Sequence, residues 1–171
     1  MKKIAFLFII FLTTTFSAYC QDTKSDFNAN ELGKEAFNIL KELDKSSEKD
    51  FINKLYSLQE IKAFINKKLD TVPSEIRENI NQMTTEEYHK KVIDEFNDLK
   101  KVGKQYSIDW NSIEYSDFTY EKREESGLKG LRGELVFKSQ NEAYIVDVEA
   151  ILVEDIYEIM IVTILVKKGN H

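Results

Sequence analysis

The stretch KGLRGELVFKSQNEAYIVDVEAILV, residues 129–153, decides the fold of this chain. Within it, two runs at 129–138 and 143–153 alternate apolar and polar residues with a period of two, as strands with one buried face do. Similar runs lie on either side, at about 113–124 and 156–167. Because the connections are short enough for hairpins, the four runs predict an antiparallel meander.

Helical periodicity fills the chain before this meander. Asn30 suits the N-cap of a first helix, and a second helical stretch follows Ser47. Ser57 and Glu60 have the spacing of a capping box, and a short helix over 74–83 follows a proline. The sequence therefore predicts an α+β fold in which N-terminal helices pack on a four-stranded antiparallel β-meander.

The most regular helical stripe runs from about Thr85 to Val102. Thr84 and Glu87 offer a capping box at its start, and Gly103 suits the position just beyond its end. The apolar side chains of this stripe need a broad apolar surface to pack on. We therefore expect the helix to lie on the core face of the sheet.

The sequence begins MKKIAFLFIIFLTTTFSAYCQD, in which Lys2 and Lys3 precede an apolar stretch and small residues follow it. This is the layout of a secretory signal peptide, and the stretch is too short to favour a retained membrane span. Cleavage requires small residues at the first and third positions before the cut. Ala18 and Cys20 therefore predict cleavage before Gln21.

Cleavage there divides the chain into a signal peptide at 1–20, a flexible N-terminal segment at 21–29 and a single α+β domain at 30–168. We expect an exported protein, periplasmic or secreted, with no membrane span in the mature chain. The alternative is an outer-membrane lipoprotein whose lipid anchor is attached to Cys20.

The charge of the mature chain follows from the same cleavage. Loss of the two lysines leaves 22 of the 24 basic residues against 30 acidic ones, so the net charge of −6 becomes −8. The single cysteine is removed as well, so no disulfide forms and stability depends on an ordinary apolar core. An acidic chain gains little from attraction to phosphates, so nucleic acid is not an expected partner.

The short connections also fix a register, which assigns each strand residue to a face. One face places Phe118, Leu135, Val146 and Thr163 in a row and is the predicted core face. A change of parity near Ser116 predicts a β-bulge in the first strand. The opposite face mixes charged and apolar side chains. Its members form the candidate interaction face: Glu121, Arg132, Glu134, Asp147, Glu149, Met160, Val162 and Ile164.

Two features make the candidate interaction face unusual. Glu134 lies opposite Asp147, a like-charge pair that could share a proton or hold a cation unless Arg132 neutralises it. Met160 and Val162 make the last strand apolar on both faces, which implies that something covers the second face. We expect one of the first two helices to cover it. A partner protein or a second copy of the chain, as in a homodimer, is the alternative.

Other groups that could carry chemistry are sparse. Glu86 and His89 have the Glu-x-x-His spacing of one half of a di-iron site, but the motif occurs once, so we expect a surface histidine. Tyr106, Trp110 and Tyr115 form an aromatic cluster that either closes one end of the core or binds a ligand. No nucleotide-binding or hydrolase motif occurs. No catalytic residue, cofactor or metal site is therefore predicted.

Residues 115–121 (YSDFTYE), 127–138 (GLKGLRGELVFK) and 143–151 (AYIVDVEAI) resemble exported bacterial proteins of unknown function. From Ser47 to Lys168, helices followed by a long meander with a bent first strand resemble the cystatin-like and nuclear-transport-factor-like cone folds. The Gln-x-Val-x-Gly loop of inhibitory cystatins and the His/Asp pair of cone-fold isomerases have no counterpart here. The resemblance implies export and an architecture, and no activity.

These observations predict a non-enzymatic exported domain that binds an unknown protein or small ligand through the candidate interaction face or the mouth of the cone. The alternative is a cone-fold small-molecule-binding protein or enzyme that uses the cavity between helix and sheet. That alternative needs polar groups that point inward. On the predicted core face these are Thr163 and the hydroxyls of Tyr120 and Tyr144.

Overall fold

The structure of the chain is a computed structural model that describes residues 23–169. The predicted signal peptide, its cleavage residues Ala18, Cys20 and Gln21, and the lipid anchor at Cys20 lie outside the described residues. Within residues 23–169, the helices are too short or too polar to cross a membrane.

Helices occupy the first part of the described chain, as predicted. They are α2 (Thr23–Lys41), α3 (Glu48–Ile52), α4 (Leu58–Asn66), α5 (Ser74–Gln82) and α6 (Thr85–Gln105), followed by the short 3-10 helix η1 (Trp110–Ser112). Capping boxes at Ser47, Ser57 and Thr84 start α3, α4 and α6, because each side chain accepts the backbone N–H of the third helical residue. The predicted starts of these three helices are confirmed.

Two helix boundaries differ from the prediction. Helix α2 begins at Thr23, so Asn30 lies inside it, and the segment 23–29, expected to be flexible, is helical. No glycine or proline interrupts that segment, so the helix continues through it. Helix α6 continues past Gly103 to Gln105, so the glycine lies inside the helix, where it packs closely on Trp110. A Cβ at Gly103 would lie 2.5 Å from the Trp110 ring.

The second half of the chain forms one antiparallel sheet in the order β1-β2-β3-β4. Its strands are β1 (Glu114–Glu125), β2 (Leu128–Ser139), β3 (Glu142–Val153) and β4 (Ile156–Lys167). Two-residue turns at 126–127, 140–141 and 154–155 join the strands, and all six turn residues have positive φ, as type I′ hairpin turns require. The predicted α+β fold with a four-stranded meander is confirmed.

The predicted register is confirmed across the first three strands. Phe118 pairs with Leu135, and Leu135 pairs with Val146. A register shift between Tyr115 and Asp117 marks the predicted bulge. Five charged residues of the candidate interaction face share the opposite face as expected: Glu121, Arg132, Glu134, Asp147 and Glu149.

The register predicted for β4 is wrong beyond the residues next to its turn. Two shifts in the pairing of β3 with β4 each add one residue to β4. Val162 consequently lies opposite Val148 on the core face, with 0% of its surface exposed. Thr163 lies opposite Asp147 on the charged face, instead of on the core face. The bulges thus keep an apolar side chain inside and turn a polar one out.

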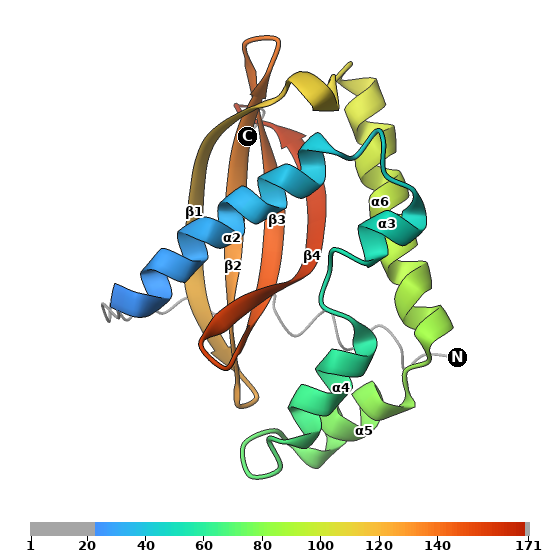
Figure 1. The fold of residues 1–171 in the computed structure, drawn as a ribbon, viewed down its shortest axis with the longest axis vertical. Coiled ribbons are helices and arrows are strands. Elements are labelled where there is room, and N and C mark those ends of the chain that lie inside the picture. The colour runs from blue at the N-terminus through green and yellow to red at the C-terminus, as the bar shows by residue number, and fades with distance from the viewer. Residues whose placement is uncertain (1–22, 170–171) are drawn as a thin grey trace.

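Helix α2 lies across the core face of the sheet, and α6 runs beside the β4 edge (Figure 1). Gly33 of α2 packs on Phe118 of β1, where a Cβ on the glycine would lie 2.5 Å from the ring. The expectation that the helix beginning at Thr85 covers the core face is therefore wrong. Helix α2 takes that place because its own apolar stripe is fully buried: Ala29, Leu32, Ala36, Ile39 and Leu40.

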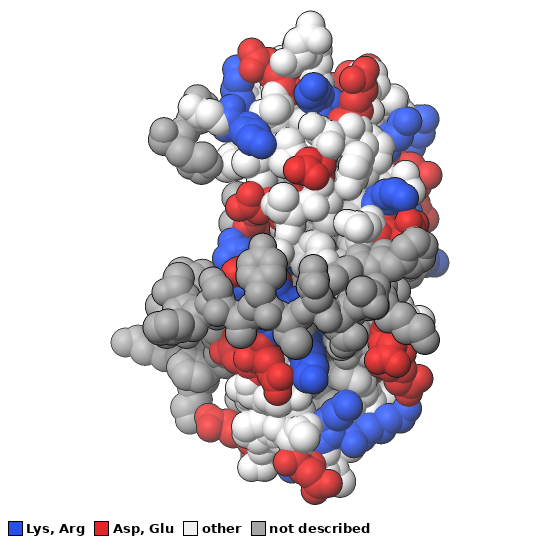
Figure 2. Space-filling view, turned by 90° about the vertical axis from the view of Figure 1, so that its left-hand side faces the viewer, with Lys and Arg blue, Asp and Glu red and all other residues white. Residues whose placement is uncertain are grey.

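Charged side chains of both signs are spread over the surface. On the side of the molecule shown in Figure 2, the Lys and Arg side chains of the described residues are interspersed with Asp and Glu. Some form ion pairs within one helix, such as Lys34 with Glu31 at 2.8 Å and Lys90 with Asp94 at 2.9 Å. Exposed pairs of this kind contribute only about 0.2–0.5 kcal/mol each to stability.

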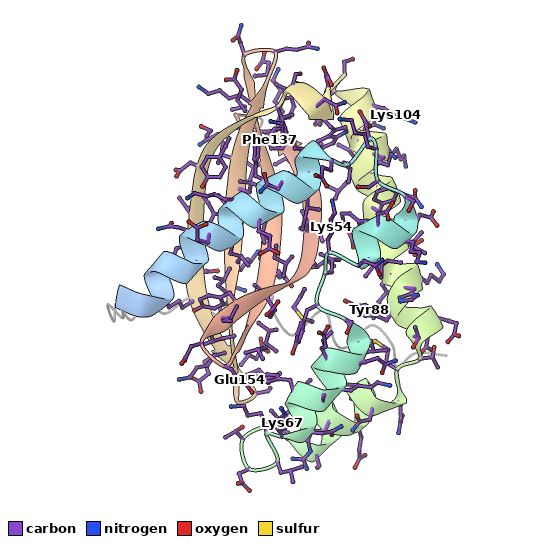
Figure 3. All side chains as sticks on the ribbon, in the orientation of Figure 1. Lys54, Lys67, Tyr88, Lys104, Phe137 and Glu154 are labelled. Atoms are coloured by element: carbon purple, nitrogen blue, oxygen red, sulfur yellow. The ribbon has the colours of Figure 1, made fainter. Side chains whose placement is uncertain are left out.

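The segment between α3 and α4 attaches the helices to the edge strand β4. The backbone N–H of Tyr56 donates to the carbonyl oxygen of Ile159 at 2.8 Å, and the Tyr88 hydroxyl of α6 donates to the Tyr56 carbonyl at 2.7 Å. In the lower part of Figure 3, Lys67 at the end of α4 lies 3.9 Å from Glu154 in the β3–β4 turn. These contacts hold α4 and α6 against one end of the sheet.

Candidate functional site

A cavity of about 170 Å³ lies between helices α4, α5 and α6 and one end of the sheet. The apolar face of helix α4 lines this cavity through Leu58, Ile61 and Ile65. Ile80 of α5 and Val92 of α6 complete the apolar part that the helices contribute. The helical side of the cavity is therefore mainly hydrocarbon.

The strands close the other side of the cavity. Leu128 of β2, Ile151 of β3 and both Met160 and Ile161 of β4 lie in its wall. Ile161 pairs with Glu149, so the β4 bulges turn it toward the charged face rather than the core face. Met160, a member of the candidate interaction face, thus lies in the cavity wall.

Hydrogen bonds fix α4 and α5 to one another around the cavity. The Lys62 ammonium donates to the carbonyl oxygens of Met83 at 2.7 Å and of Asn81 at 3.0 Å. The side-chain amides of Asn66 and Asn81 donate to each other at 3.0 Å. The short helix α5 is therefore held to α4 by polar contacts on the outside, while Ile80 and Met83 face inward to the cavity.

Glu149 is the acidic side chain in the cavity wall. It lies on β3 opposite Arg132 and two residues before Ile151, so the charged face of the sheet leads directly into the cavity. Burial raises the pKa of Glu149; Arg132 and Arg123 lower it in part, and Asp147 adds to the rise. Among the described residues, no hydrogen bond or ion pair engages the Glu149 carboxyl.

A second carboxyl, that of Glu95 on α6, lies near Glu149. Burial raises the pKa of Glu95, and the negative charges of Asp98, Asp94 and Glu149 raise it further. Helix α6 and strand β3 therefore bring two partly buried carboxyl groups together. Both are harder to ionise than carboxyl groups in water.

Arg132 pairs with Asp147 as expected. Its Nη2 atom lies 2.5 Å from the Asp147 Oδ2 atom, and Asp147 is the less exposed of the two side chains. The Asp147 carboxylate, hydrogen-bonded to the guanidinium, raises the pKa of Arg132. Glu134 is exposed beside this pair. Within the described chain, no group of three or more His, Cys, Asp or Glu side chains could hold a metal ion.

The candidate interaction face therefore divides into parts. Glu121, which pairs with Arg123, remains with Glu134 at the surface. Met160 belongs to the cavity wall. Val162 does not belong to the face at all, because it lies opposite Val148 in the core. Ile164 lies on β4, and its side chain is outside what the structure describes.

Trp110 and Tyr106 of the aromatic cluster at the junction of helix and sheet belong to the core, whereas Tyr115 is exposed. Trp110 is 1% exposed, and its ring lies 5.7 Å from that of Phe137, which Figure 3 places near the upper end of the sheet. The Tyr106 ring lies 5.4 Å from that of Tyr144. Tyr115 is 40% exposed and meets the ring of a phenylalanine of α2 edge-on. The first of the two interpretations, closure of the core, is supported.

His89 is half-buried beside Tyr88 on α6. The hydroxyl of Tyr88 is held by its hydrogen bond to Tyr56, and burial raises the pKa of Tyr88 to about 12. Tyr88 therefore stays protonated at neutral pH. Its side chain forms a fixed part of the cavity wall.

Sequence reasoning missed most of the cavity wall. The signal was present in the apolar stripe of α4 and in Ile80 and Met83, which lie three residues apart at the end of α5. Such stripes show which side of a helix is buried, but they do not show against what. The sequence identifies Glu149 as a member of the candidate interaction face, but it does not indicate a cavity there.

Replacement of Glu149 by glutamine is expected to change the pH dependence of stability. Because the pKa of Glu149 is raised in the folded state, the folded chain holds its proton more tightly than the unfolded chain. Wild-type stability should therefore fall as pH rises from the usual carboxyl range through the raised pKa. In Glu149→Gln this fall should be smaller, so the variant gains stability relative to wild type toward neutral pH. Urea unfolding from pH 4 to 8 measures the difference.

The matched control for this measurement is Glu134→Gln, an exposed carboxyl on the same sheet face. It should follow the wild-type profile. A Glu149→Gln profile parallel to wild type would contradict the raised pKa.

Comparison of the chain with family models, curated proteins and solved structures found no match.

Proposed function

We propose that this chain is a non-enzymatic binding domain that holds a small apolar molecule in the cavity between α4, α5, α6 and the sheet. The observation that carries the proposal is a cavity of about 170 Å³ with walls of leucine, isoleucine, valine and methionine side chains. An apolar cavity of roughly 150 Å³ in another protein stays dry and binds benzene. Drug-sized ligands need roughly 300–1,000 Å³. The size here fits a single ring or a short alkyl chain.

Binding without reaction fits the composition of the wall. Besides hydrocarbon, the wall contains Glu149, Tyr88, Lys91 and Lys129. The Tyr88 hydroxyl donates its hydrogen bond to the Tyr56 carbonyl oxygen, and Lys91 is engaged in another interaction. A nucleophile paired with a base, as covalent catalysis requires, is not among these four side chains.

The alternative of a docked protein partner loses its main support. It rested on a last strand that was apolar on both faces. Val162 lies in the core, and Met160 and Ile161 lie in the cavity wall. Export, and a cone-like architecture with the cavity at its mouth, are part of this proposal. The N-terminal sequence supports the first and the order of elements supports the second.

Filling the cavity is expected to abolish binding. In Met160→Trp the larger ring occupies space that a ligand would use. Toluene at about 100 times its Kd should stabilise the wild-type protein by about 2.7 kcal/mol and raise its Tm, because the ligand binds only the folded state. The variant should show no rise in Tm. Thermal unfolding with and without toluene measures this.

The control is Ile156→Trp, which places the same side chain at an exposed position of the same strand. It should respond to toluene as the wild type does. If the wild-type Tm is unchanged by toluene, or if Met160→Trp still responds, the cavity is not a binding site.

A further inference from the structure

The cavity wall is mainly apolar, and its charged members are Glu149, Lys91 and Lys129. We infer that the natural ligand is a small alkyl or arylalkyl amine, whose hydrocarbon part fills the cavity and whose ammonium group meets the Glu149 carboxylate. This inference rests on the proposed function, because it assigns the ligand class of the same cavity.

The first support is that none of the described residues donates a hydrogen bond to the Glu149 carboxylate. Both oxygens of an ionised carboxyl accept hydrogen bonds, and leaving them without donors in a partly buried position is costly. Arg132 faces Glu149 across the strands and lowers its pKa in part, while the hydrogen bond of its guanidinium goes to Asp147. Arg123 is paired with Glu121. A ligand ammonium group would supply the missing donor as a charge-assisted hydrogen bond.

The second support is the sign of the neighbouring charge. Glu95 of α6 lies close enough to Glu149 for the charge of Glu149 to raise its pKa. Glu149 lies in the cavity wall on β3, and Glu95 lies outside the residues of that wall, on α6. A cation at the Glu149 carboxyl would also be attracted to Glu95, and its charge would favour ionisation of both groups.

The lysines of the wall are the competing feature. Lys91 of α6 and Lys129 of β2 also line the cavity, and they would favour a ligand with a carboxylate. Lys91 already takes part in another interaction, and Lys129 is exposed to solvent, where its charge is screened. Glu149 is half-buried like Lys91, but unlike Lys91 it takes part in no hydrogen bond or ion pair among the described residues. The balance therefore favours a cationic ligand.

Three compounds with one ring and different polar groups test this inference: benzylamine, benzyl alcohol and benzoate. Isothermal titration of the wild-type protein at pH 7.5 should show benzylamine binding about tenfold tighter than benzyl alcohol, as a charge-assisted hydrogen bond allows. Benzoate should bind more weakly than benzyl alcohol. In Glu149→Gln the advantage of the amine over the alcohol should disappear, so that the two compounds bind with about the same affinity.

Glu134→Gln serves as the control, because Glu134 is exposed on the same sheet face and lies outside this cavity wall. It should keep the full preference for the amine. If Glu149→Gln does not fold, Glu95→Gln decides instead, and the preference for the amine should then fall by several-fold.

The outcomes separate the two proposals. Binding of benzyl alcohol without any preference for benzylamine would overturn the amine inference and leave the proposed function intact. Tightest binding of benzoate would also overturn it, in favour of an anionic ligand held by the lysines. If none of the three compounds binds, the proposed function itself fails.

Discussion

Replacement of Phe118 by alanine is expected to lower the free energy of unfolding by about 3–5 kcal/mol, the usual cost of removing a large core aromatic side chain. The Phe118 ring is 6% exposed and lies between Gly33 of α2 and Gly133 of β2. A Cβ would come within 2.5 Å of it from Gly33 and within 2.3 Å of it from Gly133. The loss would leave a hole where α2 meets the sheet. Urea unfolding of both proteins measures the effect.

The same packing predicts that the effects of Gly133→Ala and Phe118→Ala on stability are coupled, and it predicts the sign of the coupling energy. Gly133→Ala alone should destabilise, because its methyl group collides with the Phe118 ring. In the Phe118→Ala background the methyl group has room, so the double variant should be more stable than the sum of the two losses predicts. A cycle of Gly133→Ala with Phe51→Ala, a truncation in α3, is the control and should be additive. Additivity in both cycles would show that Phe118 does not need the glycine.

The register of the sheet could be predicted in those strands where apolar and polar residues alternate. In β1 to β3, two-residue turns and a clear difference between the faces allow only one pairing, and Phe118, Leu135 and Val146 lie where the sequence places them. In β4 the segment 159–165, IMIVTIL, is apolar at both parities, with Thr163 its one polar residue. A bulge in such a segment changes little in the pattern, so its extra residues could not be located in advance.

The site could be predicted only in its polar part. Glu149 is identified by its place in the charged row, whereas its burial depends on α6 and on the bulges that bring Met160 and Ile161 to the same space. Those are contacts between distant segments, which periodicity within one segment does not encode. Glu149 was therefore visible in the sequence as a member of the candidate interaction face, whereas the cavity beside it was not.

Replacement of Trp110 by alanine is also expected to cost about 3–5 kcal/mol of unfolding free energy. Trp110 is 1% exposed, and its ring packs on Gly103 of α6 and on Phe137 of β2, so it joins the end of the long helix to the sheet. An aromatic ligand site at this position would tolerate truncation with little loss of stability. Denaturant unfolding of Trp110→Ala therefore separates a core role from a binding role.

Gly103 supplies the sharper test, because two effects of opposite sign act there. Alanine is about 0.8–1.0 kcal/mol better than glycine inside a helix, yet in the wild type its Cβ would lie 2.5 Å from the Trp110 ring. We expect Gly103→Ala to destabilise the wild type by about 1–3 kcal/mol and to stabilise the Trp110→Ala variant. The control Lys104→Ala, at an exposed position of the same helix turn, should change little in either background. Stabilisation by Gly103→Ala in the wild type would mean that the ring does not press on the helix. In that case close packing on Trp110 would not explain why a glycine occupies this position inside α6.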